Sequence, residues 1–265
     1  DNLVIDKLAR VNLITGKNNV GKTALLEAVS ILGTNGFVFN LYNILHNRSG
    51  SDKILERDVI QLFPYYLGEN LIKGEMIQET IQIGYNDATH RIDIRVVYYR
   101  EENENGTIRR FEDDRSSGAK LGLELNNSGQ KQIVPLIAFD YKQYENNIIY
   151  DIARKVCFFI PSNNIDVDTY KNLWENLVLT PKENDVINCL KMIKHDLKRL
   201  YLRRGNDGKS SYFIAGIEDH DTQIPIDSLG EGFTRMLRII IGLVSAKESI
   251  LCIDEIENGL HYSVQ

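Results

Sequence analysis

The sequence has few cysteines, and its three (Cys157, Cys189 and Cys252) do not have the spacing of a metal site or a disulfide framework. Scattered cysteines are typical of a reducing compartment, so we expect a cytoplasmic protein. The chain also lacks an apolar run of about 18 or more residues, the length that a membrane-spanning helix needs. The apolar run at residues 236–246 is short and contains Arg238. We therefore expect no membrane partner.

Excess positive charge is absent too. The 265 residues include 31 lysines and arginines against 37 aspartates and glutamates, a formal net charge of −6. This balance argues against a strongly basic nucleic-acid binder but leaves a local basic patch possible. Sustained heptads and a second catalytic constellation are also lacking. The rest of the composition, 43% hydrophobic and 26% charged, is ordinary for a globular chain, and the length suits one large domain or a core with an attached lobe.

What the sequence does contain is a phosphate-binding pattern in LITGKNNVGKTALLEAVSIL, residues 13–32. The pattern GxxxxGK[ST] is filled by Gly16, Gly21, Lys22 and Thr23. Backbone N–H groups of such a loop surround phosphate oxygens at a helix N-terminus, whose dipole favours anions. We expect Lys22 to reach the β- and γ-phosphates and the Thr23 hydroxyl to bind Mg²⁺. The nucleotide-binding residues predicted here are Gly16, Lys17, Asn18, Asn19, Val20, Gly21, Lys22, Thr23 and Ala24.

The residues around this loop give it the required setting. Residues 11–15 (VNLIT) have the composition of a short strand, and a neighbouring strand precedes them. After the loop, apolar residues recur at helical spacing from Ala24 to Leu32. A strand, a glycine-rich turn and a helix in this order predict a nucleotide site.

A second nucleotide motif is SILCIDEIENGLH, residues 249–261. Its apolar run predicts a strand buried in a parallel sheet, with Asp254 and Glu255 at its carboxyl end. Asp254 would hold Mg²⁺ through its water shell, and Glu255 would act as the catalytic residue by polarising the attacking water. His261 belongs to the following loop, and we do not assign it the role of a histidine switch. Because the chain has no starting methionine and ends soon after this motif, we expect the protein to continue at both ends.

Between the two motifs stands IPIDSLGEGFTRMLRIIIGLVSA, residues 224–246, in which small residues open an apolar helix. This helix entry, followed directly by the strand ending in Asp254, resembles the signature motif of ABC-type ATPases. The order of the motifs also matches that class, and not kinases or small GTPases. In ABC-type ATPases the signature helix contacts the γ-phosphate held by a partner subunit. The resemblance implies that role for Ser228, Gly230 and Glu231.

The strings VNLITGKNNVGKTALLEA, SLGEGFTR and IDEIENGLH resemble the OLD (overcoming lysogenization defect) family, ATPases related to RecF and SMC-like repair proteins. This resemblance implies ATP-dependent dimerisation, with two nucleotides held between the P-loop and the signature motif of opposite subunits. It also implies work beside a nuclease or toxin in defence against phage or foreign DNA. Many members carry a Toprim nuclease domain after the ATPase, and this sequence shows none.

The middle of the chain contains alternating apolar and polar residues. Residues 77–86 and 91–100 are predicted antiparallel strands, and the Asn105-Gly106 pair predicts a hairpin turn. Residues 131–140 and 155–161 predict two further strands. Gln61 is the candidate for a Q-loop.

A helix is predicted over residues 180–202, with Thr180 as its cap and Pro181 in its first turn. Its expected apolar face consists of Leu190, Ile193, Leu197 and Leu200. A neighbouring basic stripe consists of Lys191, Lys194 and Lys198, continued by Arg203 and Arg204. This stripe is either a solvated surface or a contact for DNA or an effector.

The predicted fold class is α/β: an ABC-type P-loop ATPase head with a mostly parallel core sheet, an antiparallel β-lobe and a helical insertion. Its expected parts are a P-loop half (1–35), a β-rich lobe with an insertion (36–160), a helical subdomain (161–210) and a half with the signature helix and second motif (211–265). We expect ATP and Mg²⁺ as cofactors, and a homodimer or higher homo-oligomer with composite ATP sites.

Three function classes remain open. The first is an ATP-gated sensor that acts through a protein effector. The second is the head of an ATPase–nuclease. The third is a DNA-repair head of RecF or SMC type that clamps DNA, which the lack of heptads disfavours. A transporter ATPase is disfavoured because the signature departs from LSGGQ.

Overall fold

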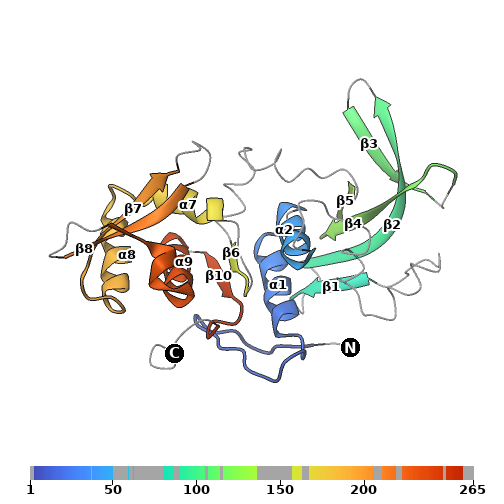
Figure 1. Ribbon diagram of the computed structural model, residues 1–265. Helices are drawn as coiled ribbons and strands as arrows, with labels where there is room; N and C mark the ends of the chain where they lie inside the picture. The colour runs from blue at the N-terminus through green and yellow to red at the C-terminus, as the bar shows by residue number, and fades with distance from the viewer. Residues whose placement is uncertain are drawn as a thin grey trace.

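Two groups of elements, each with its own apolar core, lie on either side of a short parallel β-ladder (Figure 1). The computed structural model describes residues 3–36, 38–49, 59, 62, 80–85, 90–104, 107–113, 116–135, 157–162, 167–205, 211–218, 223–246 and 249–258. No helix in these ranges is long and apolar enough to cross a membrane.

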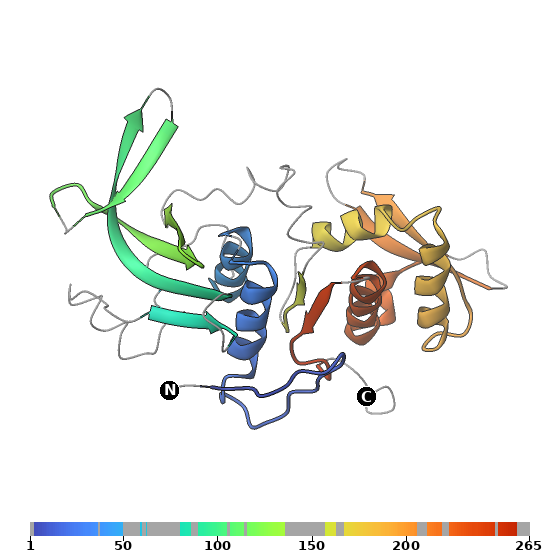
Figure 2. The same ribbon diagram turned by 180° about the vertical axis from the view of Figure 1, so that it is seen from behind.

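The first group consists of two helices and an antiparallel sheet. Its elements are α1 (Lys22–Gly33), α2 (Val38–Ser49), β1 (Thr80–Gly84), β2 (Arg91–Glu104), β3 (Thr107–Glu112), β4 (Lys120–Asn127) and β5 (Gln130–Pro135). The strand order is β1-β2-β4-β5, and β3 pairs with β2. Alternate residues of β2, Ile92, Ile94 and Val96, are buried in one core with Leu41 and Leu45 of α2. The sheet therefore packs one face on the helices, as Figure 2 shows from behind.

The antiparallel strands expected at residues 77–86 and 91–100 are confirmed by β1 and β2. The hairpin is confirmed as well, because Glu104 of β2 pairs with Thr107 of β3 across a connection of two residues. The turn residues Asn105 and Gly106 themselves lie outside the described residues. The strand expected at 131–140 is present as β5 as far as Pro135.

The two helices of this group meet through polar side chains. The buried Glu27 of α1 forms an ion pair with Arg48 of α2. One turn further, the buried Ser30 accepts a hydrogen bond of 3.0 Å from Asn40 Nδ2. Because buried polar groups are stable only when paired, these contacts restrict how α1, the helix that follows the phosphate-binding loop, can be placed.

The second group is built around the apolar face of one long helix. Its elements are α7 (Val167–Glu175), α8 (Pro181–Lys191), β7 (Leu197–Arg204), β8 (Ser211–Ile217), β9 (Gln223–Pro225), the 3₁₀ helix η1 (Ile226–Leu229) and α9 (Glu231–Ser245). The apolar residues of α9 recur every three or four positions, and Phe233, Leu237 and Ile241 are buried against Trp174 and Leu190. The apolar helix predicted within residues 224–246, opened by small residues, is thus confirmed, and it begins at Glu231.

The ladder between the groups pairs β6 (Cys157–Ile160) with β10 (Ile250–Ile253) in parallel, and both strands contact α1 and α9. Cys157 and Cys252, far apart in the sequence, meet here: a hydrogen bond between their thiols and burial raise the pKa of Cys252. Among the described residues, parallel pairing is limited to these two strands. The broader expectation of a mixed α/β fold with several sheets is met, and a mostly parallel core sheet is not found in this part of the chain.

The helix predicted over residues 180–202 is wrong in its second half. It ends at Lys191, and β7 begins at Leu197 and pairs antiparallel with β8. The register of β7 shifts between Leu197 and Arg199, so the buried positions Leu197 and Leu200 are three residues apart instead of two. A bulged strand therefore reproduced the spacing of a helix, and the basic stripe is divided between α8, the following turn and β7.

The strand predicted at residues 11–15 is also wrong. Residues 3–20 contain neither helix nor strand, and Val11 and Leu13 are 85% and 78% exposed. A strand needs a neighbour that pairs with its N–H and C=O groups, and no described residue pairs with this segment as a strand.

Leu179 offers a test of local strain. It is 94% exposed and has φ of +63°, a left-handed conformation that costs a side chain about 1–2 kcal/mol. We expect Leu179→Gly to stabilise the protein by about 0.5–1 kcal/mol, measured by thermal unfolding. Met192→Gly is the matched control, because Met192 is 78% exposed but has φ of −64°. A Leu179→Gly variant that is less stable than the wild type would contradict the argument.

Candidate nucleotide-binding site

The predicted phosphate-binding loop lies immediately before α1. Residues 16 to 21 are all exposed, and Asn19 and Gly21 have φ of +62° and +93°. These left-handed conformations let the chain turn sharply into the helix, and Leu25 N–H donates to Gly21 C=O at 3.0 Å. No side chain caps the N-terminus of α1, so its first N–H groups face the loop. This is the arrangement that a phosphate group requires.

Lys22 bends back over this loop. Its Nζ donates to the carbonyl oxygens of Gly16 and Lys17 at 2.9 and 2.8 Å. The positive charge of the side chain is thus held at the loop, where the sequence predicts the phosphates. Both acceptors are neutral carbonyl groups and not carboxylates. The ammonium group therefore keeps its charge and is suited to bind an anion.

Thr23 and Asp254 are brought together although 231 positions separate them in the sequence. The Thr23 hydroxyl lies 3.0 and 2.9 Å from the two carboxylate oxygens of Asp254. Asp254 directly follows β10 and is 3% exposed, and its N–H donates to Ile160 C=O at 2.8 Å. A hydroxyl and a carboxylate side by side supply the hard oxygen atoms that Mg²⁺ prefers, so the two residues fit the ion predicted for them.

Glu255 is the next residue along the chain. Its side chain is exposed, and its backbone has φ of +47°, which is unusual for any residue other than glycine. The conformation makes the chain turn after Asp254, so that two successive carboxylates have different surroundings. One carboxylate is buried against Thr23, and the other is accessible to water.

Arg235 is a site residue for which the sequence reasoning predicted no role. It lies in the second turn of α9 and is only 8% exposed. Its Nη2 donates to the carbonyl oxygens of Asp254 and Glu255 at 2.6 and 2.7 Å. The signal that could have identified it is a charged residue on the otherwise apolar face of the predicted signature helix.

The signature residues form an exposed corner. Ser228 lies in η1, and α9 begins at Glu231; both residues and Gly230 between them are exposed. Gly230 has φ of +97° and ψ of 158°, a region that essentially only glycine adopts. In the described part of the chain, no hydrogen bond joins these three residues to the phosphate-binding loop. Gly230 N–H donates to Asp227 C=O at 3.4 Å, and all three residues are accessible from solvent.

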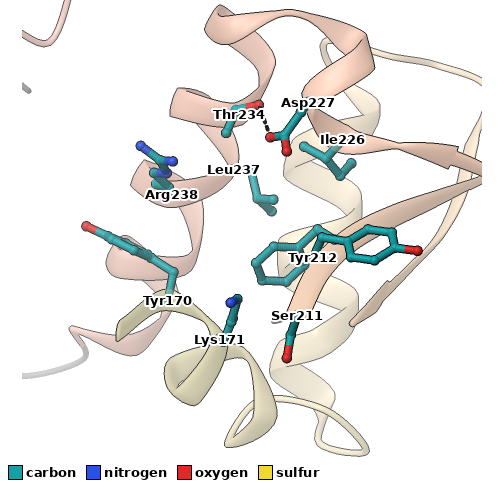
Figure 3. A pocket seen from close by; sticks show the side chains of 10 residues that line it. Tyr170, Lys171, Ser211, Tyr212, Ile226, Asp227, Thr234, Leu237 and Arg238 are labelled. Carbon is teal, nitrogen blue, oxygen red and sulfur yellow. Dashed lines mark hydrogen bonds between the residues drawn. The ribbon is translucent and has the colours of Figure 1, made fainter. Parts of the chain in front are cut away.

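A pocket of about 270 Å³ lies next to this corner (Figure 3). Two of its lining residues, Asp227 and Thr234, are linked by a hydrogen bond of 3.5 Å, and two others, Lys171 and Arg238, are cationic. Its lining shares no residue with the phosphate-binding loop or with the turn at Asp254 and Glu255. The pocket is therefore separate from the nucleotide site. The predicted Q-loop residue Gln61 and His261 lie outside the described residues.

Comparisons with known proteins agree with a nucleotide site. Residues 11–265 match the protein family described as "AAA domain, putative AbiEii toxin, Type IV TA system". The chain is also similar to a Helicobacter pylori protein named ATP/GTP phosphatase. The two sequences are 22% identical over an alignment of 291 positions. The alignment covers 99% of this chain and 74% of the relative.

Proposed function

Because the chain belongs to this family of AAA domains and is a P-loop ATPase, we propose that its nucleotide-dependent dimerisation controls an associated effector protein or nuclease. We further propose that it is an ABC-class head of the OLD family, acting in defence against phage or foreign DNA. The three motif strings support the OLD branch. The description of the matched family, which refers to a toxin–antitoxin system, supports a partner with an effector role.

The contact between Thr23 and Asp254 carries the proposal, because it unites the two nucleotide motifs at one point. The two side chains would hold Mg²⁺, with phosphate and water oxygens as its other ligands. When bound, the ion supplies positive charge against the β- and γ-phosphates. Lys22 and the N–H groups of residues 16–24 would bind the phosphates, and the exposed Glu255 would polarise the attacking water.

The exposed signature corner supports a composite site. Ser228, Gly230 and Glu231 are accessible from solvent, and no side chain caps the N-terminus of α9. In a dimer these groups would contact the γ-phosphate of a nucleotide held by the partner subunit. We propose a homodimer or a higher homo-oligomer on this basis. We also keep the division of a single head into parts at 1–35, 36–160, 161–210 and 211–265 as a proposal.

The alternative, a DNA clamp of RecF or SMC type, has less support. The feature of the sequence that supported DNA contact was the basic stripe. The fold divides this stripe between α8, the following turn and β7. Lys191 and Lys194 form ion pairs of 3.0 and 2.7 Å with Glu218 and Asp196. Lysines that are already paired attract a phosphate backbone less strongly.

Mixing two inactive variants tests the composite site. Gly230→Asp places a negative side chain where the partner's γ-phosphate would approach, so it should spare ATP binding and cripple hydrolysis. Lys22→Ala should lose binding. In a mixed dimer both defects fall in one composite site and leave the other intact, so ATPase activity should return on mixing, as measured by phosphate release.

Gly118→Asp is the matched control, because Gly118 has φ of +94° and, like Gly230, open space where a Cβ would be added. It carries the same new charge at a similarly positive φ, far along the chain from the signature corner. Normal hydrolysis by Gly230→Asp would refute the signature assignment and leave a P-loop ATPase without a composite site.

A further inference from the structure

We propose that Arg235 is a positioning residue that fixes the catalytic turn at Asp254 and Glu255 and makes its geometry depend on the signature helix. This inference rests on the proposed roles of Glu255 and the signature corner. It concerns a side chain that is not expected to touch the nucleotide.

Within the described part of the chain, the hydrogen-bond partners of Arg235 are backbone carbonyl groups and not side chains. Besides the carbonyl oxygens of Asp254 and Glu255 at 2.6 and 2.7 Å, it donates through Nη1 to Ser162 C=O at 3.2 Å and Pro161 C=O at 3.4 Å. These four oxygens belong to the two segments that directly follow β10 and β6. One side chain from α9 therefore ties together the carboxyl ends of both strands of the ladder.

If Arg235 served stability alone, burying its charged side chain with these partners would be unfavourable. Arg235 is 8% exposed, and its Nε is buried without a hydrogen-bond partner among the described residues. A buried donor without a partner destabilises the folded protein. The four described acceptors are carbonyl dipoles, which offset a buried positive charge less well than a carboxylate does. An apolar residue would pack at this position without these costs, which favours a positioning role.

What Arg235 holds is a strained conformation. Glu255 has φ of +47°, a left-handed conformation that is unfavourable for a residue with a side chain. Such a conformation persists only where its surroundings enforce it. Arg235 Nη2 binds the carbonyl oxygens of the two peptide groups on either side of the Glu255 Cα, and Asn258 N–H donates to Glu255 C=O at 2.9 Å. Without Arg235 we expect the turn to relax and the Glu255 carboxylate to move.

Asp254 should be affected less than Glu255. Its N–H is bound to Ile160 C=O at 2.8 Å, and its carboxylate is bound to Thr23. Loss of Arg235 should therefore leave the Mg²⁺ and phosphate contacts in place while displacing the carboxylate that polarises water. The expected defect lies in kcat and not in ATP affinity.

The same contacts give α9 a route to the reaction. Gly230 and Glu231 begin the helix, and Arg235 lies one turn further along it. A helix moves as a rigid element, so closure of a partner subunit on the signature corner would move the guanidinium group and the turn that it holds. Arg235 thereby makes the position of Glu255 depend on assembly.

The test uses the full chain with Arg235→Gln and Arg235→Lys, and Arg238→Gln as the control from the same helix. For Arg235→Gln we expect kcat to fall about 100-fold, because small displacements of a catalytic group cost that much, with the Kd of Mg–ATP within about threefold of the wild type. Arg235→Lys should lose about tenfold in kcat, because an ammonium group cannot bind four carbonyl oxygens in a plane. Arg238→Gln should behave like the wild type.

A double mutant distinguishes positioning from general damage. If Arg235 acts through Glu255, adding Arg235→Gln to Glu255→Gln should lower kcat by less than about threefold further. Independent effects that multiply would overturn the proposal, as would wild-type kcat in a folded Arg235→Gln variant. Should the glutamine variant not fold, Arg235→Lys decides alone: wild-type kcat there overturns the proposal as well. Failure here leaves the rescue between Gly230→Asp and Lys22→Ala unaffected, so the two proposals fail separately.

Discussion

Replacing Lys22 by alanine is expected to weaken ATP binding more than 100-fold while leaving the fold intact. Among the described residues, Lys22 Nζ donates to two carbonyl oxygens of its own exposed loop, so its removal leaves no buried group of this region unpaired. In the complex, by contrast, its ammonium group would neutralise phosphate charge. Truncating one partner of such a charge pair costs about 2–5 kcal/mol, and about 2.8 kcal/mol corresponds to a factor of 100 in Kd.

Titration calorimetry with Mg–ATP measures this effect, and circular dichroism checks the fold. Lys182→Ala serves as control, because Lys182 also stands in the first turn of a helix, α8. A folded Lys22→Ala variant with near-normal affinity would mean that the loop does not bind phosphate.

Replacing Glu255 by glutamine is expected to lower kcat by about 10²–10⁴-fold while ATP still binds. Glutamine has nearly the same size and meets the same backbone conformation, so the turn held by Arg235 should persist. It cannot take up a proton from the attacking water. The contact between Thr23 and the buried Asp254 is unchanged, so Mg²⁺ and ATP should be retained.

Because hydrolysis is blocked after binding, the ATP-bound assembly should accumulate, and size-exclusion chromatography with ATP would detect it. Glu257→Gln is the control, since Glu257 is exposed on the same loop. Wild-type turnover in Glu255→Gln would remove Glu255 from the mechanism.

The sequence predicted the meeting of Thr23 and Asp254 well, because both motifs encode chemistry in their own side chains and the chemistry demands one metal ion. It also predicted the β2–β3 hairpin and the start of α9, where local turn residues and apolar spacing act over a few positions. The hairpin and the start of α9 depend on preferences of residues that are close together in the sequence.

Arg235 could not be assigned in this way. Its four partners are backbone carbonyl groups, which every residue has, so nothing in the sequence of the segments that it binds marks the contact. The prediction of a strand at residues 11–15 was wrong for a related reason: the pairing of a strand depends on a neighbouring strand that is distant in the sequence. In β7 the cause was a bulge, which gave Leu197 and Leu200 a helical interval.

The two separate apolar cores bear on how the protein unfolds. One core contains Leu41, Leu45 and the sheet of β2 and β4, and the other surrounds Trp174 and α9. Domains with independent cores behave as separate cooperative units, each with its own free energy of opening. Thr23 belongs to α1 of the first unit, and Asp254 is held by Arg235 of the second. A nucleotide that binds both residues would therefore raise the stability of each unit through the other. With ATP bound, the two units would then unfold as one cooperative unit.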